Sequence, residues 1–162
     1  MAENHYSREE QLDSFYRSER RHLMEKVVIL QVLVKKFGMN VRETVKGERA
    51  RLVQSQWKKI AEQTAGILIR DLIETLWEPL KQKGIVSYEV TSNDEKKTCI
   101  KVTQCLFARL VEELNIPKDW GYDLYCQDDE YMVKGFNEEM EFSRSMTLME
   151  GHDYCDHCYR LI

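Results

Sequence analysis

The sequence predicts an α+β fold in which N-terminal long helices pack on a four-stranded antiparallel sheet made of two hairpins. Three observations predict it. Apolar residues recur at three- and four-residue steps through residues 1–83, and β-rich runs are confined to residues 84–162. A polar segment also separates the two runs of each pair, as in a hairpin. Helices followed by strands are typical of α+β proteins rather than of alternating α/β proteins.

The composition indicates an ordinary globular protein. Of 162 residues, 43% are hydrophobic and 32% are charged. We expect residues 1–162 to form a single domain, with a helical part at 1–83 and a sheet with intervening helices at 84–162.

The helical part is expected to contain two long helical stretches. Ser7 opens a capping-box signature (Ser-x-x-Glu), and Gly38 is placed to end the first helix. The second stretch spans about residues 41–83. A helix of that length is unusual in a compact domain, so we expect a break near Gly47 or Gly66.

The first predicted hairpin joins β-rich runs at 85–90 and 98–102 through a polar segment. Helical spacing returns at 105–114 and stops before Pro117, and a short helix is expected at 119–133.

The second predicted hairpin lies at the C-terminus. A run at 140–149 is followed by a turn at 150–153 and by a run at 155–162. Gly151 lies among polar residues in this turn, so we expect the last two strands to be adjacent and antiparallel.

The N-terminal residues 1–5 are polar, and no apolar stretch follows a basic start as in a secretory signal. The longest apolar run, 27–34, contains Gln31 and is shorter than the ~18 residues of a membrane span. We therefore expect a cytoplasmic protein that does not enter a membrane.

Charge is divided unevenly along the chain. Residues 1–83 carry 16 Lys and Arg against 12 Asp and Glu, a net charge of +4, and residues 84–162 carry 8 against 16, a net charge of −8. The basic residues alternate with acids along helical faces, which indicates salt-bridged surfaces. No basic stripe interleaved with aromatics is present, and this argues against nucleic acid as a partner.

The chain contains five cysteines, an odd number in a sequence without an export signal: Cys99, Cys105, Cys126, Cys155 and Cys158. Free thiols or metal ligands are therefore favoured over a disulfide framework.

The segment from His152 to Cys158 holds two cysteines, two histidines and two aspartates. Cys155-x-x-Cys158 has zinc-ligand spacing, but a structural zinc site needs a second pair. On a strand, Cys155 and His157 face one side and Cys158 faces the other, so the ligands would not converge. A thioredoxin-like redox pair normally lies at the start of a helix, so two cysteines within a strand do not suit that function either. We expect no metal and no other cofactor.

A second cluster, Tyr125-Cys126-Gln127-Asp128-Asp129, has two interpretations. Taken alone, it is best explained as a buried thiol beside solvated acids near a helix end. Together with the C-terminal cluster, it supports a functional site.

Three segments carry a family resemblance: 126–128 (Cys-Gln-Asp), 135–137 (Gly-Phe-Asn) and 143–156, which contains Thr-Leu-Met-Glu-Gly-His-Asp-Tyr-Cys-Asp. They resemble the pattern of the L-2-amino-thiazoline-4-carboxylic acid hydrolase family, over roughly residues 100–162. The glycine-to-cysteine ending also looks like small-molecule-binding domains of the 4-vinyl reductase type and, more distantly, TRAPP-type α+β folds. His157-Cys158 stands where an aromatic-basic pair is frequent.

The resemblance implies a hydrolase that opens a 2-aminothiazoline-4-carboxylate-like cyclic amidine to an N-carbamoyl-cysteine-type product. Such chemistry needs a nucleophile or base, an acid for the leaving sulfur and a cation for the carboxylate. The candidate catalytic residues are Cys126, Asp128, Cys155 and Asp156. The candidate substrate-binding residues are Arg144, Asn137, His152 and Arg160. In the alternative interpretation, Cys155 fills the sheet core and Asp156 caps a turn.

Two rival functions remain open. One is a non-catalytic small-molecule-binding or sensor module like the 4-vinyl reductase domain, and the other is a homodimeric structural protein joined through the second long helix. The hydrolase and the binding module differ in whether the four candidate catalytic residues converge. A catalytic site requires convergence, whereas a binding module needs an apolar channel.

Overall fold

The computed structural model describes residues 7–162, so the polar segment 1–5 considered above lies outside the described residues. Helix α1 spans Arg8–Phe37. The Ser7 side chain accepts from the Glu10 N–H and the Glu10 carboxylate accepts from the Ser7 N–H, so the predicted capping box is confirmed. Gly38, at φ 85°, ends the helix by donating its N–H to the Val34 carbonyl.

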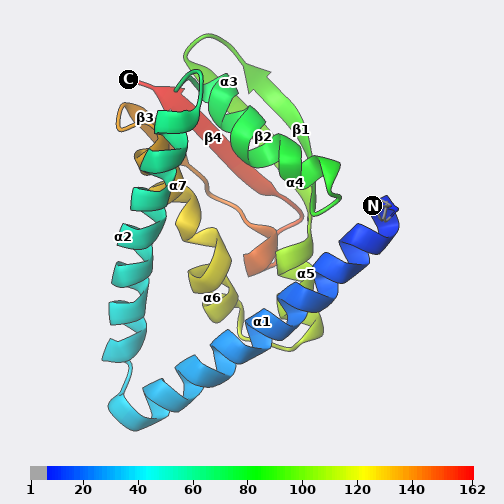
Figure 1. The fold of residues 1–162 in the computed structure, drawn as a ribbon, viewed down its shortest axis with the longest axis vertical. Coiled ribbons are helices and arrows are strands. Elements are labelled where there is room, and N and C mark those ends of the chain that lie inside the picture. Colours follow the sequence, from blue (N-terminus) through cyan, green and yellow to red (C-terminus); the bar gives the residue numbers. More distant parts are fainter. Residues whose placement is uncertain (1–6) are drawn as a thin grey trace, which may run out of the picture.

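The second helical stretch is broken once, near Gly66. Helix α2 spans Asn40–Gln63, and residues 64–68 are not helical. The expected break near Gly66 is confirmed, whereas Gly47 lies inside α2. The chain then continues as α3 (Ile69–Leu72), a π-helical turn η1 (Ile73–Trp77) and α4 (Glu78–Gln82). Figure 1 shows α1 and α2 diverging from the turn at Gly38.

Four antiparallel strands form one sheet in the order β1-β2-β4-β3, which confirms the predicted fold class. The strands are β1 (Val86–Asn93), β2 (Lys97–Cys105), β3 (Met140–Ser143) and β4 (Cys155–Leu161). The two hairpins meet through β2 and β4, so β4 lies inside the sheet. The helical elements between the hairpins are α5 (Leu106–Glu113), α6 (Lys118–Gly121), a π-helical turn η2 (Tyr122–Cys126) and α7 (Asp128–Phe136).

The last two strands are adjacent and antiparallel, as predicted, but the first of them is short. β3 ends at Ser143 rather than near residue 149, and the 3-10 turn η3 (Leu148–Glu150) precedes Gly151. The reason is local. The N–H groups of Ser145 and Met146 donate to the Asp156 carboxylate instead of to a neighbouring strand.

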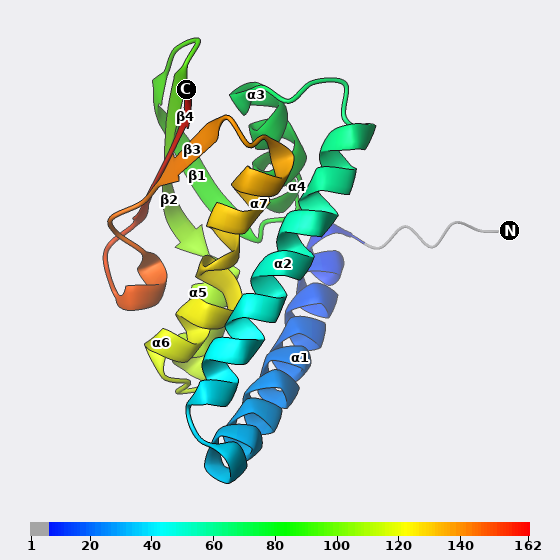
Figure 2. The ribbon, with the colours of Figure 1, turned by 90° about the vertical axis from the view of Figure 1, so that its left-hand side faces the viewer.

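The helices lie on one side of the sheet, as Figure 2 shows. Helices α2 and α7 approach closely at Gly135, where a Cβ atom would lie 2.9 Å from the Trp57 Cβ and even nearer the Gln54 carbonyl oxygen. The glycine of the Gly-Phe-Asn segment therefore permits this packing. The buried side chains of the sheet that face the helices include Val86, Tyr88, Ile100, Val102, Met140, Cys155, His157 and Tyr159.

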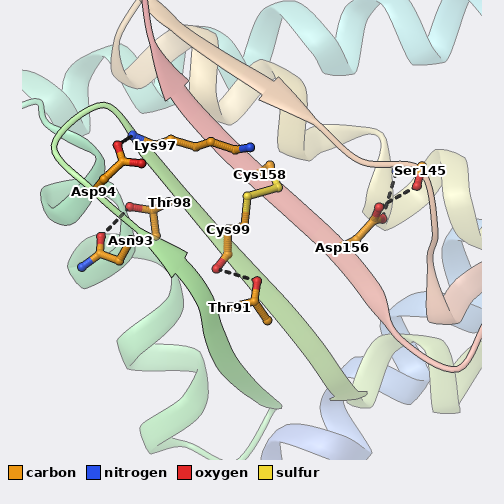
Figure 3. Close-up of a disulfide and its surroundings, with 9 residues drawn as sticks. All are labelled: Thr91, Asn93, Asp94, Lys97, Thr98, Cys99, Ser145, Asp156 and Cys158. Carbon is orange, nitrogen blue, oxygen red and sulfur yellow. Dashed lines mark hydrogen bonds between the residues drawn. A yellow bond between two sulfur atoms is a disulfide. The ribbon is translucent and has the colours of Figure 1, made fainter.

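The opposite sheet face carries a disulfide between Cys99 and Cys158 (Figure 3). The expectation that all five cysteines are free thiols or ligands is therefore wrong for these two. The pairing of β2 with β4 sets Cys99 directly opposite Cys158, although 59 residues separate them in sequence. Cys105, Cys126 and Cys155 are free.

No helix within residues 7–162 is both long enough and apolar enough to cross a membrane.

Candidate functional site

A cavity of about 330 Å³ lies between the helices and the inner face of the sheet. Most of its wall is apolar, with side chains from α1, the η1–α4 segment, α5 and the sheet. Polar and sulfur-containing groups line the rest, and they come from six elements and the loop after β3. They are Glu19, Lys26, Arg49, Cys105, Tyr125, Cys126, Asp128, Asp129, Arg144, Cys155 and His157.

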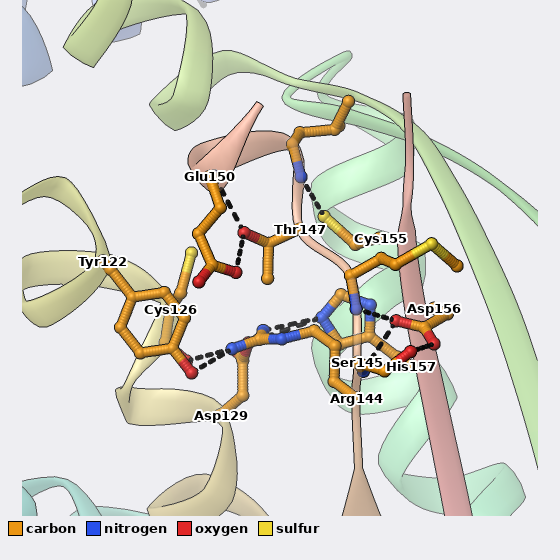
Figure 4. Close-up of polar contacts among 12 residues, drawn as sticks. Tyr122, Cys126, Asp129, Arg144, Ser145, Thr147, Glu150, Cys155, Asp156 and His157 are labelled. Carbon is orange, nitrogen blue, oxygen red and sulfur yellow. Dashed lines mark hydrogen bonds and ion pairs between the residues drawn. The ribbon is translucent and has the colours of Figure 1, made fainter. Parts of the chain in front are cut away.

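Arg144 is the centre of a buried polar network beside this cavity (Figure 4). Its side chain is 5% exposed and forms an ion pair with Asp129. The second guanidinium nitrogen, Nη2, donates to the Tyr122 hydroxyl at 3.2 Å and to the Cys126 carbonyl at 3.0 Å. Burial acts to lower the pKa of Arg144, but the effects of Asp129, Cys126 and Tyr122 together outweigh it and raise the pKa, so the guanidinium stays charged.

His157 projects from β4 into the same network and is 3% exposed. Its Nε2 lies 3.1 Å from Arg144 Nη1 and 3.4 Å from an Asp129 carboxylate oxygen. The ring meets the edge of Trp77, with centroids 4.9 Å apart.

The other ring nitrogen of His157, Nδ1, is buried and has no hydrogen-bond partner among the described residues. If Nε2 accepts from Arg144, Nδ1 carries a proton without an acceptor. If Nε2 donates to Asp129, Nδ1 has a lone pair without a donor. Both tautomers leave a polar group for a bound molecule to satisfy, since unpaired buried groups are costly.

The three free thiols, Cys105, Cys126 and Cys155, all line the cavity. Burial raises the pKa of Cys155 to about 11, although the Leu148 N–H, 3.1 Å from Sγ, opposes the shift. Burial and the Asp129 charge raise the pKa of Cys126, and burial raises that of Cys105. All three are neutral thiols near pH 7, so a thiol nucleophile here needs a base.

A second carboxylate, Asp128, is 5% exposed and is held by Arg49 of α2. Arg49 Nε lies 2.9 Å from Oδ1, and Nη2 lies 2.5 Å from Oδ2 and 2.8 Å from the Leu124 carbonyl oxygen. Burial raises the pKa of Asp128, and the Arg49 charge opposes that rise. This fork-like pairing fixes the position of α7 relative to α2.

The π-helical turn η2 brings three groups to Arg144. Within this turn the Gln127 N–H donates to the carbonyl of Tyr122, five residues earlier, at 3.0 Å. Tyr122, Cys126 and Asp129 then face the guanidinium together.

Four of the eight residues predicted from the sequence line this cavity: Cys126, Asp128, Cys155 and Arg144. The structure therefore brings two of the predicted cysteines, one predicted aspartate and one predicted arginine to the same cavity.

The other four predicted residues lie elsewhere. Asp156 and Arg160 are on the opposite face of β4, where Asp156 caps the turn at Ser145. Asn137 follows α7 and donates to the Ile67 carbonyl. His152 is exposed and lines a different pocket of about 520 Å³. Their roles in binding or catalysis stay predictions.

Asp129, His157 and Cys105 were not among the predicted site residues. Asp129 and His157 belonged to the two clusters, and period-two alternation already set His157 on the same face as Cys155. Glu19, Lys26 and Arg49 come from α1 and α2, where one charged residue among many gives no sequence signal. Within residues 7–162, no group of three or more His, Cys, Asp or Glu is arranged to hold a metal ion.

Comparison with known proteins gives one family and several structures. The family model described as L-2-amino-thiazoline-4-carboxylic acid hydrolase matches residues 16–159. No curated protein matches the chain.

Two solved structures match this chain, and the likeness to the first of them supports the fold. One is a trafficking protein particle complex subunit 3 from Naegleria fowleri, covalently bound to palmitic acid. It has 11% identity and a TM-score of 0.55, over 90% of this chain and 95% of that one. The other is the phenol-responsive sensory domain of the transcription activator PoxR with phenol. It has 11% identity and a TM-score of 0.47, over 83% of this chain and 71% of that one.

Proposed function

Because the chain belongs to the L-2-amino-thiazoline-4-carboxylic acid hydrolase family, we propose that its cavity binds and hydrolyses a 2-aminothiazoline-4-carboxylate-like cyclic amidine. Residues 16–159 account for nearly the whole chain, which supports treating 1–162 as one functional unit. The product is of the N-carbamoyl-cysteine type.

The observation that carries this proposal is a buried histidine, His157, which lines the cavity together with three free thiols and whose Nδ1 has no hydrogen-bond partner among the described residues. Asp129 and Arg144 hold the opposite nitrogen and so orient the ring. A histidine held in this way exchanges a proton at its remaining nitrogen, which general acid–base catalysis requires.

In the proposed reaction, water adds to the amidine carbon while His157 Nδ1 accepts its proton. A carbon–oxygen bond forms, and the tetrahedral intermediate then expels the ring sulfur. His157 returns the proton to the sulfur, and the second water hydrogen ends on the former ring nitrogen. One water is consumed, one carbon–sulfur bond breaks, and a urea and a thiol are formed.

Cys126 and Cys155 are the alternative nucleophiles in this proposal. Because burial holds both thiols neutral, either must transfer its proton to a base before it attacks. His157 supplies that base at the same cavity wall. Replacing each cysteine by Ser and by Ala distinguishes the routes, since direct water addition survives both changes.

One observation favours a second function, a non-catalytic binding module. The cavity wall is mostly apolar and its thiols are neutral, which suits an apolar ligand. The trafficking subunit with the similar fold is covalently bound to palmitic acid. A homodimer joined through α2 and a cytoplasmic location also stay predictions.

Incubation of the purified protein with L-2-aminothiazoline-4-carboxylate tests the proposed function. We expect one new thiol per substrate consumed, detected with a thiol reagent, and N-carbamoyl-cysteine in the mass spectrum. His157→Gln should abolish both signals, whereas Arg160→Gln on the other sheet face should retain them. If the unchanged protein releases no thiol but binds medium-chain fatty acids, the binding-module function replaces the hydrolase.

A further inference from the structure

Three cations line the cavity within residues 7–162, and two of them are fully engaged. Arg144 pairs with Asp129 and donates to two further oxygens. Arg49 forms a fork with Asp128 and donates to a backbone carbonyl. Neither can turn to a ligand without leaving a buried carboxylate unpaired, which is strongly unfavourable.

Lys26 differs from both arginines. Its Nζ lies 3.8 Å from the Glu19 carboxylate, its side chain is 41% exposed, and its other neighbour is the ring of Tyr125, 5.8 Å away. A contact of that length between partly exposed groups contributes little. Lys26 therefore lines the cavity with a side chain whose ammonium group can change partner at low cost.

Glu19, by contrast, is fixed. The Tyr125 hydroxyl donates to its Oε1 at 2.7 Å, and its side chain is 16% exposed. Both residues belong to α1 and lie seven positions apart, so they face the same side two turns from each other. Lys26 and the Tyr125 hydroxyl both contact Oε1, so Glu19 keeps its place when Lys26 moves to a ligand and can accept from that ligand through Oε2.

The charges along this wall are balanced, since three carboxylates (Glu19, Asp128 and Asp129) accompany the three cations. A ligand with a net charge would leave one group unpaired. A zwitterion would replace the long contact between Lys26 and Glu19 by two closer ion pairs, one with each residue. A protonated cyclic amidine that bears a carboxylate has this charge pattern.

We propose that Lys26 and Glu19 are the charge-recognition pair for a zwitterionic ligand, with Lys26 binding its carboxylate and Glu19 its protonated amidine. This inference rests on the proposed function for the identity of the ligand. It replaces the cation expected from the sequence, because Arg144 is engaged and Arg160 lies on the other sheet face.

Calorimetric titration with two ligands tests the pair. The first is L-2-aminothiazoline-4-carboxylate, and the second is 2-amino-2-thiazoline, which lacks the carboxylate. The unchanged protein is used if it does not consume the first ligand, and the His157→Gln background is used if it does. The titration thus tests binding whatever the outcome for hydrolysis, which thiol release reports separately.

Lys26→Met should weaken binding of the carboxylate ligand by about tenfold, the usual value of one charge-assisted hydrogen bond, and leave the second ligand unaffected. Lys26→Arg should restore most of the loss. Glu19→Gln, which keeps an acceptor for the Tyr125 hydroxyl, should weaken binding of both ligands. The matched control is Lys58→Met on the exposed surface of α2. Thermal unfolding of each variant verifies folding.

Three results would overturn the inference. The first is an equal loss of affinity for both ligands in Lys26→Met. The second is the same loss of affinity in Lys58→Met, and the third is the failure of the unchanged protein to bind either ligand.

Discussion

The two faces of strand β4 differ in almost every property although their residues alternate along seven positions. Cys155, His157 and Tyr159 are buried and face the helices. Asp156, Cys158 and Arg160 are on the other face, where the first caps a turn, the second forms a disulfide and the third is exposed.

The difference shows that a dense cluster of reactive residues in sequence is not one site. Strand geometry assigns successive side chains to opposite faces, so the cluster from His152 to Cys158 is divided by the sheet. The inward residues meet side chains of the helical layer, as when Trp77 donates its indole N–H to the Tyr159 hydroxyl at 2.8 Å.

The largest effect expected from this comparison is on catalysis. His157→Gln removes the proton-exchanging nitrogen and should lower kcat for thiazoline hydrolysis by about 10²–10⁴-fold, the usual contribution of a general acid or base. Arg160→Gln on the outer face should change kcat by no more than about twofold. Steady-state thiol release measures both, and comparable losses in the two variants would contradict the division of the strand.

The next effect concerns stability on the inner side. Asp129→Asn leaves the buried guanidinium of Arg144 without its counter-charge and should cost about 3–5 kcal/mol of unfolding free energy. Glu130→Gln is the matched control, because Glu130 forms an exposed pair with Lys134 worth about 0.3–0.5 kcal/mol. Urea unfolding should separate the two variants clearly; equal midpoints would mean that the Arg144 network does not stabilise the fold.

On the outer face, the disulfide should provide the main stabilisation. Cys158→Ser should lower the unfolding free energy by about 2–4 kcal/mol, as usual for a bond that closes a long loop. Reduction of the wild-type protein should lower the Tm equally and leave the variant unaffected. Alkylation after unfolding without reductant should modify three cysteines per chain, and modification of five would show that the bond is not formed.

The smallest effect is expected at the turn that Asp156 caps. Asp156→Ala removes acceptors for the Ser145 N–H at 2.9 Å and the Met146 N–H at 2.6 Å, and should cost about 1 kcal/mol at pH 7. Burial alone would raise the pKa of Asp156, but its hydrogen bonds with Ser145 and Met146 lower it below the ordinary value.

The sign of the pH dependence follows from that lowered pKa. The stabilisation by Asp156 is fully present above the unfolded carboxyl pKa near 4 and is lost as pH falls through the folded pKa. The wild type and Asp156→Ala should therefore converge in acid. A difference in unfolding free energy that stays constant down to pH 2 would contradict this assignment.

Much of the fold could be predicted because its signals are local. The capping box at Ser7, the break near Gly66 and the apolar periodicities each depend on a few neighbouring residues. The length of β3 could not be predicted, because the carboxylate of Asp156 captures N–H groups ten and eleven positions away.

The candidate site was predictable only in part. Cys126, Asp128, Cys155 and Arg144 carry the family pattern or chemically suitable groups, and they do line one cavity. The pairing of Cys99 with Cys158, and the approach of Arg49 to Asp128, join positions 59 and 79 residues apart. Such contacts depend on strand register and helix packing, which no short segment of the sequence specifies.

The π-helical turn at Tyr122–Cys126 makes the helical segment around the site sensitive to insertion and deletion. Each residue of an α-helix advances the chain by about 100° and 1.5 Å. Removing one residue from this turn would restore regular α-helix and rotate everything after it by about that angle relative to Trp120. Asp129 would then turn away from Arg144, and Asp128 away from Arg49. Natural relatives that keep this network should keep the segment between Trp120 and Asp129 at constant length, while the loop from Asp94 to Lys96, which does not line the cavity, is free to vary.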